Sequence, residues 1–339
     1  MSEPLEPYQY TLKRSVSCRG VGLHTGKPVN MTINPAPADS GIRFYRSDLD
    51  SGPVIPAQID RIVDTTLATT LGDGATRVST TEHLMAALRG SGIDNAWIEL
   101  DSHEVPIMDG SAGPFVMLLK RSGRQRQKAP RRVMRITRPI SYVQGDRTIR
   151  IEPYDGFKVT GSIQFDDNFR QTYSIEVTKK RFWKEIARAR TFGFVEEVEQ
   201  LWANGLALGG TLANVIAIHW DGRSILNEDG LRFDDEFIRH KVLDLIGDLA
   251  LLGCPLQGHV VADRSGHGLH RGLMQTIVRE TDKWEYVQLR ENGSSVQEEV
   301  ISKRKYFGRN GGNGKKNGRS SYPYILSGSK GGQSAAWLA

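Results

Sequence analysis

The chain has 339 residues, which is enough for two domains, because single hydrophobic cores rarely grow past roughly 250–300 residues. It contains no apolar run of the ~18–20 residues that a membrane span requires, and no basic-then-apolar leader follows Met1, so we expect a soluble, cytoplasmic protein. Its two cysteines, Cys18 and Cys254, are too few and too far apart in sequence for a disulfide framework, which fits a reducing compartment.

The formal net charge of +6 comes mostly from one end of the chain. Residues 291–339 hold eight lysines and arginines against three glutamates, and the remaining residues are close to neutral. We therefore expect no nucleic-acid partner for the folded part. The tail from 291 to 339 is also rich in Gly, Ser and Asn with hardly any apolar spacing, so we expect it to lack regular structure.

The first half favours strands, turns and two short helices. Short β-rich pieces alternate with turn residues from 10 to 60, and residues 93–100 alternate like a strand. Ser79 followed three residues later by Glu82 is a capping-box pattern, which predicts a helix that begins there and ends near Gly90 or Gly92. Local pattern alone makes Glu82 a helix cap and His83 a surface residue. A second short helix is expected after Pro114.

The second half has the same style. Residues 120–132 are basic and carry no apolar periodicity, so we place an inter-domain linker at 125–132, between a first domain at 1–124 and a second at 133–290. We expect strands around 133–143, 147–152, 158–165 and 171–177, helical segments from about 180 to 204, and a long helix over 233–252 that Gly253 ends. This order predicts an α+β fold with helices that cover sheets.

The long helix carries the chemistry-bearing residues His240, Asp244 and Asp248. Because side chains four positions apart share one helix face, these three would line one edge. A hydrolytic zinc site needs about three protein ligands and an open position. His240 and Asp244 could supply two of them and His83 a third, with Glu82 beside the metal as a general base. The alternative is an ordinary ion pair between His240 and Asp244, which helices contain very often.

Three other segments could belong to a site. His24 and His267 each lie among glycines, which suits a turn that presents an imidazole, although turn histidines are commonly incidental. The small and apolar residues of 205–218 could wall a pocket for an apolar ligand, or could form an ordinary buried turn and strand.

Seven short motifs, in order and in both halves, give a more specific indication. The chain closely resembles the zinc-dependent UDP-3-O-acyl-N-acetylglucosamine deacetylases of lipid A biosynthesis over about residues 10–290. The matching segments are 20–26 (GVGLHTG), 81–88 (TEHLMAAL), 106–111 (PIMDGS), 189–194 (ARTFGF), 230–233 (GLRF), 239–244 (RHKVLD) and 265–267 (SGH).

The resemblance implies two similar α+β domains, each a small β-sheet layered with α-helices, with the active site between them. By motif, His83, His240 and Asp244 correspond to the ligands of one Zn²⁺ per chain. Glu82 corresponds to the general base that takes a proton from zinc-bound water, and His267 to the general acid near the leaving amine.

The resemblance also assigns supporting roles. Asp248 would orient His267, Thr191 would help to hold the oxyanion, and Lys241 would be a substrate-binding cation. The remaining residues near the sugar and acyl chain would be His24, Phe192 and Phe194. The chain departs from the family at Ala213, where Asp is usual, at His270, where Asn is usual, and in the tail after about 291.

The expected partner is a small lipid-bearing UDP-sugar, and we expect a monomer with at most weak peripheral membrane contact. A second hypothesis keeps zinc amide hydrolysis but gives the enzyme another N-acyl substrate, which the dependence of the rate on acyl chain and nucleotide would reveal. A third is a metal-stabilised binding module that uses the basic tail on nucleic acid or anionic lipid. It requires strongly salt-dependent binding that is lost with residues 291–339.

Overall fold

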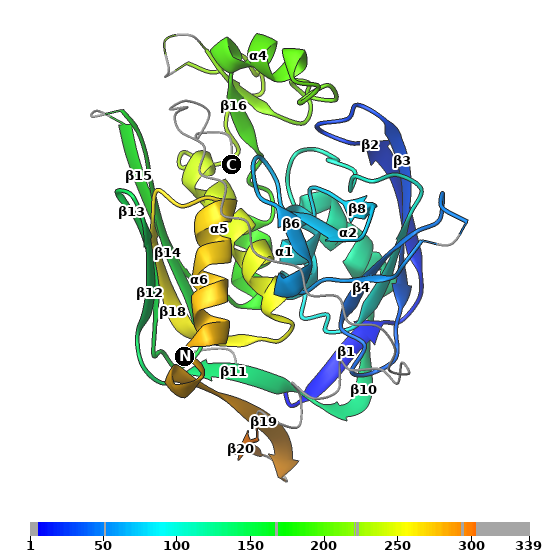
Figure 1. Ribbon diagram of the computed structural model, residues 1–339, viewed down its shortest axis with the longest axis vertical. Helices are drawn as coiled ribbons and strands as arrows, with labels where there is room; N and C mark the ends of the chain where they lie inside the picture. The colour runs from blue at the N-terminus through cyan, green and yellow to red at the C-terminus, as the bar shows by residue number, and fades with distance from the viewer. Residues whose placement is uncertain are drawn as a thin grey trace, which may run out of the picture.

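The computed structural model describes residues 6–50, 52–166, 169–219, 221, 224–292 and 295–302. Two β-sheets lie on the outside and the main helices lie between them (Figure 1). Helices α1 and α2 belong to the side formed by the first half, whereas α5 and α6 pack on the sheet of the second half, and α1 contacts α5 where the two sides meet. The α+β class expected from the sequence is confirmed.

The first half contains a five-stranded sheet of order β2-β3-β9-β4-β5 and a three-stranded sheet of order β6-β7-β8. Its elements are β1 (Tyr8–Leu12), β2 (Val16–Val21), β3 (Pro28–Pro35), β4 (Ile42–Arg46), β5 (Ile55–Pro56), η1 (Ile59–Arg61), β6 (Ile62–Asp64), β7 (Thr70–Asp73), β8 (Thr76–Val78), α1 (Glu82–Gly90), β9 (Ala96–Leu100), α2 (Gly113–Ser122) and β10 (Arg124–Pro130).

The second half is built on an eight-stranded sheet in which β18 pairs with β11, β13 and β14. Its elements are β11 (Arg132–Ile136), β12 (Ile140–Gln144), β13 (Arg147–Glu152), β14 (Phe157–Asp166), β15 (Phe169–Glu176), α3 (Lys179–Arg181), the π-helical turn η2 (Phe182–Ile186), β16 (Phe192–Phe194), η3 (Val195–Glu197), α4 (Val198–Ala203), β17 (Ile216–Ile218), α5 (Glu236–Leu249), η4 (Ala250–Leu252), β18 (Leu256–Asp263), α6 (His267–Arg279), η5 (Thr281–Lys283), β19 (Trp284–Asn292) and β20 (Ser295–Ile301).

Residue patterns explain most of these elements. Strand β9 buries Ala96, Ile98 and Leu100 and exposes Trp97 and Glu99, as the two-residue period of a half-buried strand requires. The long helix predicted over 233–252 is α5 followed by the turn η4, and it ends where Gly253 adopts a φ of 76°. Glycine takes this left-handed conformation without a steric penalty, so the chain can turn back into β18.

Four details differ from the sequence-based expectations. Residues 124–130, placed largely in a linker, form β10, which pairs with β1. Residues 295–301, expected to lack structure, form β20 against β19. The helical segment expected over 180–204 is interrupted by β16, which pairs with β17 and orders that region as a parallel pair. Helix α6 was not predicted, although Leu269, Leu273 and Ile277 repeat at helical spacing. The rest of the predicted tail, 303–339, lies outside the described residues.

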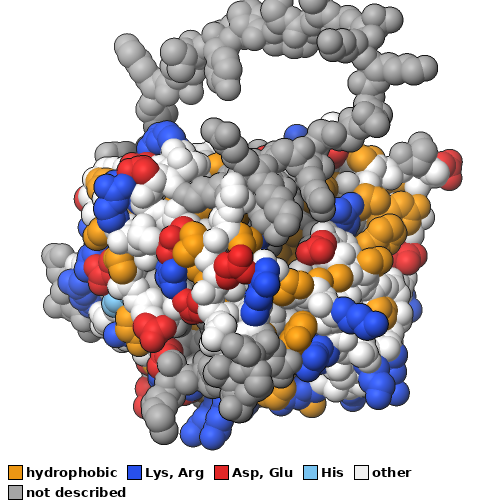
Figure 2. All heavy atoms as spheres, turned by 90° about the horizontal axis from the view of Figure 1, so that it is seen from below, with side chains coloured by type: hydrophobic (Ala, Val, Ile, Leu, Met, Phe, Trp, Pro, Cys, Tyr) orange, Lys and Arg blue, Asp and Glu red, His pale blue; other side chains and the backbone are white. Residues whose placement is uncertain are grey.

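The face of the molecule in Figure 2 carries basic and acidic side chains side by side. Ion pairs between charged side chains are frequent among the described residues: Arg135 contacts Glu285 and Glu298 at 2.6 and 2.5 Å, and Arg290 contacts Glu299 at 2.8 Å. Within the described part of the chain, no helix is both long and apolar enough to cross a membrane.

Helices α1 and α5 meet at Gly247. A Cβ atom on this glycine would lie 2.0 Å from the carbonyl oxygen of Glu82, which is far inside van der Waals contact. The absence of a side chain at Gly247 therefore lets the start of α1 approach the last turn of α5. This approach brings Glu82 and His83 to the edge of α5 that carries His240 and Asp244.

Replacing Gly247 by Ala should separate the two helices. Because the clash is with backbone, it cannot be relieved by a rotamer change, and we expect a loss of about 1–3 kcal/mol or more in the free energy of unfolding. Urea denaturation measures it. Gly268→Ala is the matched control, since a Cβ there meets nothing closer than 3.9 Å and Ala is the better helix former. Equal stabilities for the two variants would contradict this account of the crossing.

Candidate active site

Three ligand-type side chains converge where α1 meets α5. His83 Nε2 and His240 Nε2 each lie 3.4 Å from Asp244 Oδ1, and the candidate ligand atoms of the three residues are all within 4.8 Å of one another. All three side chains are buried. The sequence could place only His240 and Asp244 together, and the fold supplies His83 from the other half.

The spacing of these atoms suits zinc. Two ligands at about 2.0–2.1 Å from a tetrahedral Zn²⁺ are roughly 3.4 Å apart, which is the separation found here. The Nδ1–H of His240 donates to the carbonyl oxygen of Ala189 at 3.1 Å, so its Nε2 lone pair is available to a metal. Buried Asp244 Oδ1 forms no hydrogen bond with any described group. The residues present therefore fit a zinc ion.

Glu82 lies beside this set, in the first turn of α1. Its Oε2 accepts a hydrogen bond from the backbone N–H of Thr69 at 3.0 Å, and its Oε1 is 3.8 Å from His267 Nε2. Ser79, the expected capping partner, instead contacts the hydroxyl of Thr70. The capping-box interpretation of Glu82 and the surface placement of His83 are thus wrong, because tertiary contacts between the halves bury both side chains.

His267, at the start of α6, faces Glu82 across the site. Its Nδ1–H donates to Asp248 Oδ2 at 2.7 Å, and the Thr69 hydroxyl donates to Asp248 Oδ1 at 2.6 Å. Although burial disfavours the imidazolium, the negative charges of Asp248 and Glu82 raise the pKa of His267 to about 9. His267 is therefore protonated at neutral pH, with Nε2–H directed toward the space beside Glu82.

His270, one of the departures from the family pattern, also contacts Asp248. Its Nδ1–H donates to Asp248 Oδ2 at 2.7 Å, and the Ser265 hydroxyl donates to its Nε2 at 2.9 Å. Burial lowers the pKa of His270, so it remains neutral and donates only one hydrogen bond to Asp248. Because Asp248 accepts from His267, His270 and Thr69, its position on α5 is tightly fixed. Against burial, which opposes the change, the two histidines lower the pKa of Asp248 to about 2.

A cavity of about 270 Å³ extends from these residues. The structure brings Thr191, Lys241 and His24 to its wall together with Glu82 and His267. Its other walls are mainly apolar and come from η3, α4 and residues 207–217, including Leu201, Trp202, Leu212 and Val215, and from the aromatic residues Phe192 and Phe194. Every candidate site residue from the sequence except Asp248 lines this cavity, and Asp248 contacts it through His267.

Two residues that position the site, Glu104 and Thr69, were not predicted from the sequence. Glu104, completely buried, accepts hydrogen bonds from the backbone N–H groups of His24 and Thr25 at 2.8 and 2.9 Å, which fixes the His24 turn. Thr69 links Glu82 to Asp248 through its backbone and its hydroxyl. Neither residue has a local pattern that indicates such a role, because their partners are distant in sequence.

Ala213, the other departure from the family pattern, lies in the segment 210–214. In this segment the neighbouring Asn214 side chain accepts from the backbone N–H of Thr211 and donates to the carbonyl of Gly209. The turn is therefore held by Asn214, without a polar group at Ala213.

A buried pair of histidines with one aspartate, a carboxylate beside them and an apolar cavity leading away are typical of hydrolytic metal enzymes. Comparisons with known proteins give the family. Residues 9–279 match the model of the UDP-3-O-acyl N-acetylglycosamine deacetylase family.

Named relatives agree. The chain is 50% identical to the UDP-3-O-acyl-N-acetylglucosamine deacetylase of Acidithiobacillus ferrooxidans over 287 residues, which are 84% of this chain and 94% of that protein. It is 51% identical to the enzyme of the same name from Methylococcus capsulatus, over 84% of this chain and 94% of that protein. It is also 51% identical to the one from Oleidesulfovibrio alaskensis, over 79% of this chain and 88% of that protein. The chain belongs to the UDP-3-O-acyl-N-acetylglucosamine deacetylase family, and the resemblance found in the sequence is confirmed.

Proposed function

We propose that this chain is a zinc-dependent hydrolase that removes the N-acetyl group from UDP-3-O-(3-hydroxyacyl)-N-acetylglucosamine, the committed step of lipid A biosynthesis. The observation that carries the proposal is the convergence of His83, His240 and Asp244 beside Glu82 and His267 at one end of a largely apolar cavity. A metal centre next to an acid and a base suits amide hydrolysis, and the apolar walls suit an acyl chain.

His83, His240 and Asp244 would hold the ion. A bound Zn²⁺ supplies a Lewis acid and lowers the pKa of a water molecule to about 7. Glu82 takes a proton from the attacking water, whose oxygen forms the new bond to the acetyl carbon. His267 gives its Nε2 proton to the sugar nitrogen as the C–N bond breaks, so that acetic acid and the free amine leave. Transfer of the proton from Glu82 to His267 then restores both groups, and the acetic acid ionises to acetate in solution.

Other residues position the substrate. The Thr191 hydroxyl, on the cavity wall, donates to the oxygen that gains negative charge, and such donors are typically worth about 2.7–4 kcal/mol. Lys241, whose ammonium lies 5.6 Å from the Phe192 ring, binds the charged part of the substrate. Asp248 keeps His267 oriented and protonated. His24, Phe192 and Phe194 contact the sugar and the acyl chain.

Cytoplasmic location, a monomeric state and weak peripheral membrane contact belong to the same proposal. A substrate that bears an acyl chain supplies the reason for contact with a lipid surface.

Chelation tests the proposed metal dependence. Metal analysis should find one zinc per chain, and removing it with a chelator should reduce acetate release from the UDP-sugar to background. Adding Zn²⁺ should restore the rate, whereas Mg²⁺, which prefers oxygen ligands in octahedral geometry, should not. Full activity in the metal-free protein would overturn the proposal. Equal rates on N-acetyl substrates that lack UDP or the acyl chain would favour the broader amide hydrolase instead.

A further inference from the structure

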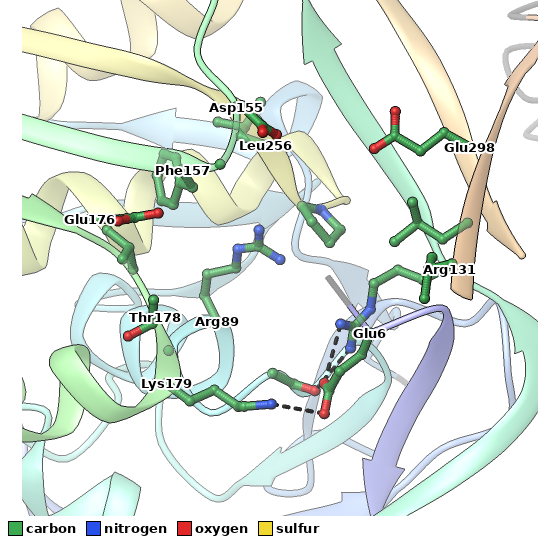
Figure 3. Close-up of a pocket in the computed structure, with 17 residues that line it drawn as sticks. Glu6, Arg89, Arg131, Asp155, Phe157, Glu176, Thr178, Lys179, Leu256 and Glu298 are labelled. Carbon is green, nitrogen blue, oxygen red and sulfur yellow. Dashed lines mark hydrogen bonds and ion pairs between the residues drawn. The ribbon is translucent and has the colours of Figure 1, made fainter. Parts of the chain in front are cut away.

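A second cavity, of about 360 Å³, lies at the other end of α1 and shares no lining residue with the first (Figure 3). Its walls come from the end of α1, the starts of β11, β14 and β18, the end of β15 and the β19–β20 hairpin. Nothing in the proposed deacetylase reaction uses this cavity.

Arg89, the penultimate residue of α1, extends into the middle of this cavity (Figure 3). Among the described residues, its guanidinium forms no hydrogen bond or ion pair, and its nearest ring contact is Phe157, whose centroid is 6.0 Å away. Burial, with the nearby charge of Arg131, lowers the pKa of Arg89 to about 10, so the group is still a cation at neutral pH. Charges that are largely withdrawn from solvent are normally paired, whereas half-buried Arg89 presents to the cavity a guanidinium that no described residue engages.

The side of the cavity around Arg89 has an excess of positive charge. The two carboxylates nearest to it are both in use, because Glu6, which lines the cavity, is shared among three cations, and Asp94, which lies outside the lining, bonds to Arg131 at 2.6 Å. The three cations on Glu6 are Arg124, Arg131 and Lys179, at 2.9, 3.4 and 2.8 Å. Although burial would raise it, the hydrogen bonds from Arg124 and Lys179 lower the pKa of Glu6 to about 2. Neither acid is therefore available to neutralise Arg89.

Other lining residues limit what can enter. Asp155, Glu176 and Glu298 also line the cavity, so a ligand with more than one anionic group would meet repulsion from their carboxylates. A guanidinium presents a planar fork of donors that matches carboxylate and phosphate oxygens. We propose that this cavity binds a small molecule bearing a single carboxylate or phosphate group, held by Arg89 on the side where Arg131 and Lys179 also lie.

Inorganic phosphate and acetate serve as the two test anions, at constant ionic strength with chloride as the replaced salt. In the full-length, zinc-loaded protein, the Arg89 Nε–Hε NMR signal is identified by its loss in Arg89→Lys and Arg89→Met. We expect one anion or both to move this signal saturably. A response to acetate alone would identify a carboxylate ligand, and a response to phosphate alone would identify a phosphate monoester.

Calorimetric titration gives the size of the effect. Arg89→Met should weaken binding of the anion at least tenfold, and Arg89→Lys should weaken it less because the charge remains. Arg77→Met is the control and should leave anion binding unchanged, since Arg77 is an exposed cation on β8. The rate of acetate release from the UDP-sugar verifies that each variant is folded. This assay does not depend on the measurement of anion binding. If neither anion moves the Arg89 signal saturably, or if Arg89→Met binds as tightly as the wild type, the proposal is wrong.

Discussion

Replacing Glu82 by Gln is expected to lower kcat about 10²–10⁴-fold while zinc stays bound. The change keeps the size of the side chain but removes the carboxylate that accepts the proton from water, and general bases contribute rate factors of this order. The three candidate ligands are His83, His240 and Asp244, so zinc content should not depend on Glu82. Steady-state acetate release, together with zinc analysis of the same samples, measures both quantities.

Glu99→Gln is the matched control, because Glu99 is an exposed glutamate on β9, in the same half of the chain. Its kcat should equal that of the wild type. Wild-type kcat for Glu82→Gln would show that another group takes the proton. Loss of zinc in Glu82→Gln would instead make Glu82 a ligand, contrary to the geometry of the site.

Glu82 also shows how far the sequence predicts the site. The Ser79-to-Glu82 spacing correctly indicated that a helix begins here, but local spacing cannot tell a cap from a base. Which role Glu82 takes depends on two other residues. Gly247 lets the backbone of α1 pack closely against α5, and the backbone N–H of Thr69 donates to Glu82 in place of a capping donor. Both lie outside the helix that they affect.

The edge of α5 was predictable, because a four-residue spacing fixes which side chains share a helix face. The groups that contact this edge were not predictable. The partners of Asp248 are Thr69, His270 and His267, which are 179, 22 and 19 residues away in the chain, and no period in the sequence relates them. The motif resemblance supplied the association that spacing could not, and the fold supplies its physical reason.

Strand β10 and strand β20 illustrate a different limit. Strand β10 is mostly basic and polar, strand β20 has only Val296, Val300 and Ile301 as apolar residues, and each strand exists because a partner strand offers a ladder of backbone hydrogen bonds. Backbone pairing of this kind leaves little trace in the side-chain pattern. Composition alone therefore suggested a linker at 125–132 and an unstructured tail from 291.

Replacing His267 by Gln is expected to lower kcat about 10²–10⁴-fold and to remove one limb of the pH–rate profile. In the wild type His267 must carry its proton to act as general acid, and its pKa is about 9. The rate should therefore hold at neutral pH and fall as the pH rises through about 9. Gln cannot donate an acidic proton to the leaving amine, so the variant should be slow at every pH and should lack that decline.

Asp248→Asn provides the sharper check, because it changes the pKa of His267 without removing the imidazole. Asp248 contributes the largest of the charges that raise this pKa, whereas burial lowers it. Without the carboxylate charge, burial dominates, and the decline in rate should move from about pH 9 to lower pH. His270→Asn keeps a side chain that can donate to Asp248, so it should leave the decline near pH 9. A decline that stays at pH 9 in Asp248→Asn, or that persists in His267→Gln, would assign the acid to another group on the cavity wall, and Lys241 would then be the first to test.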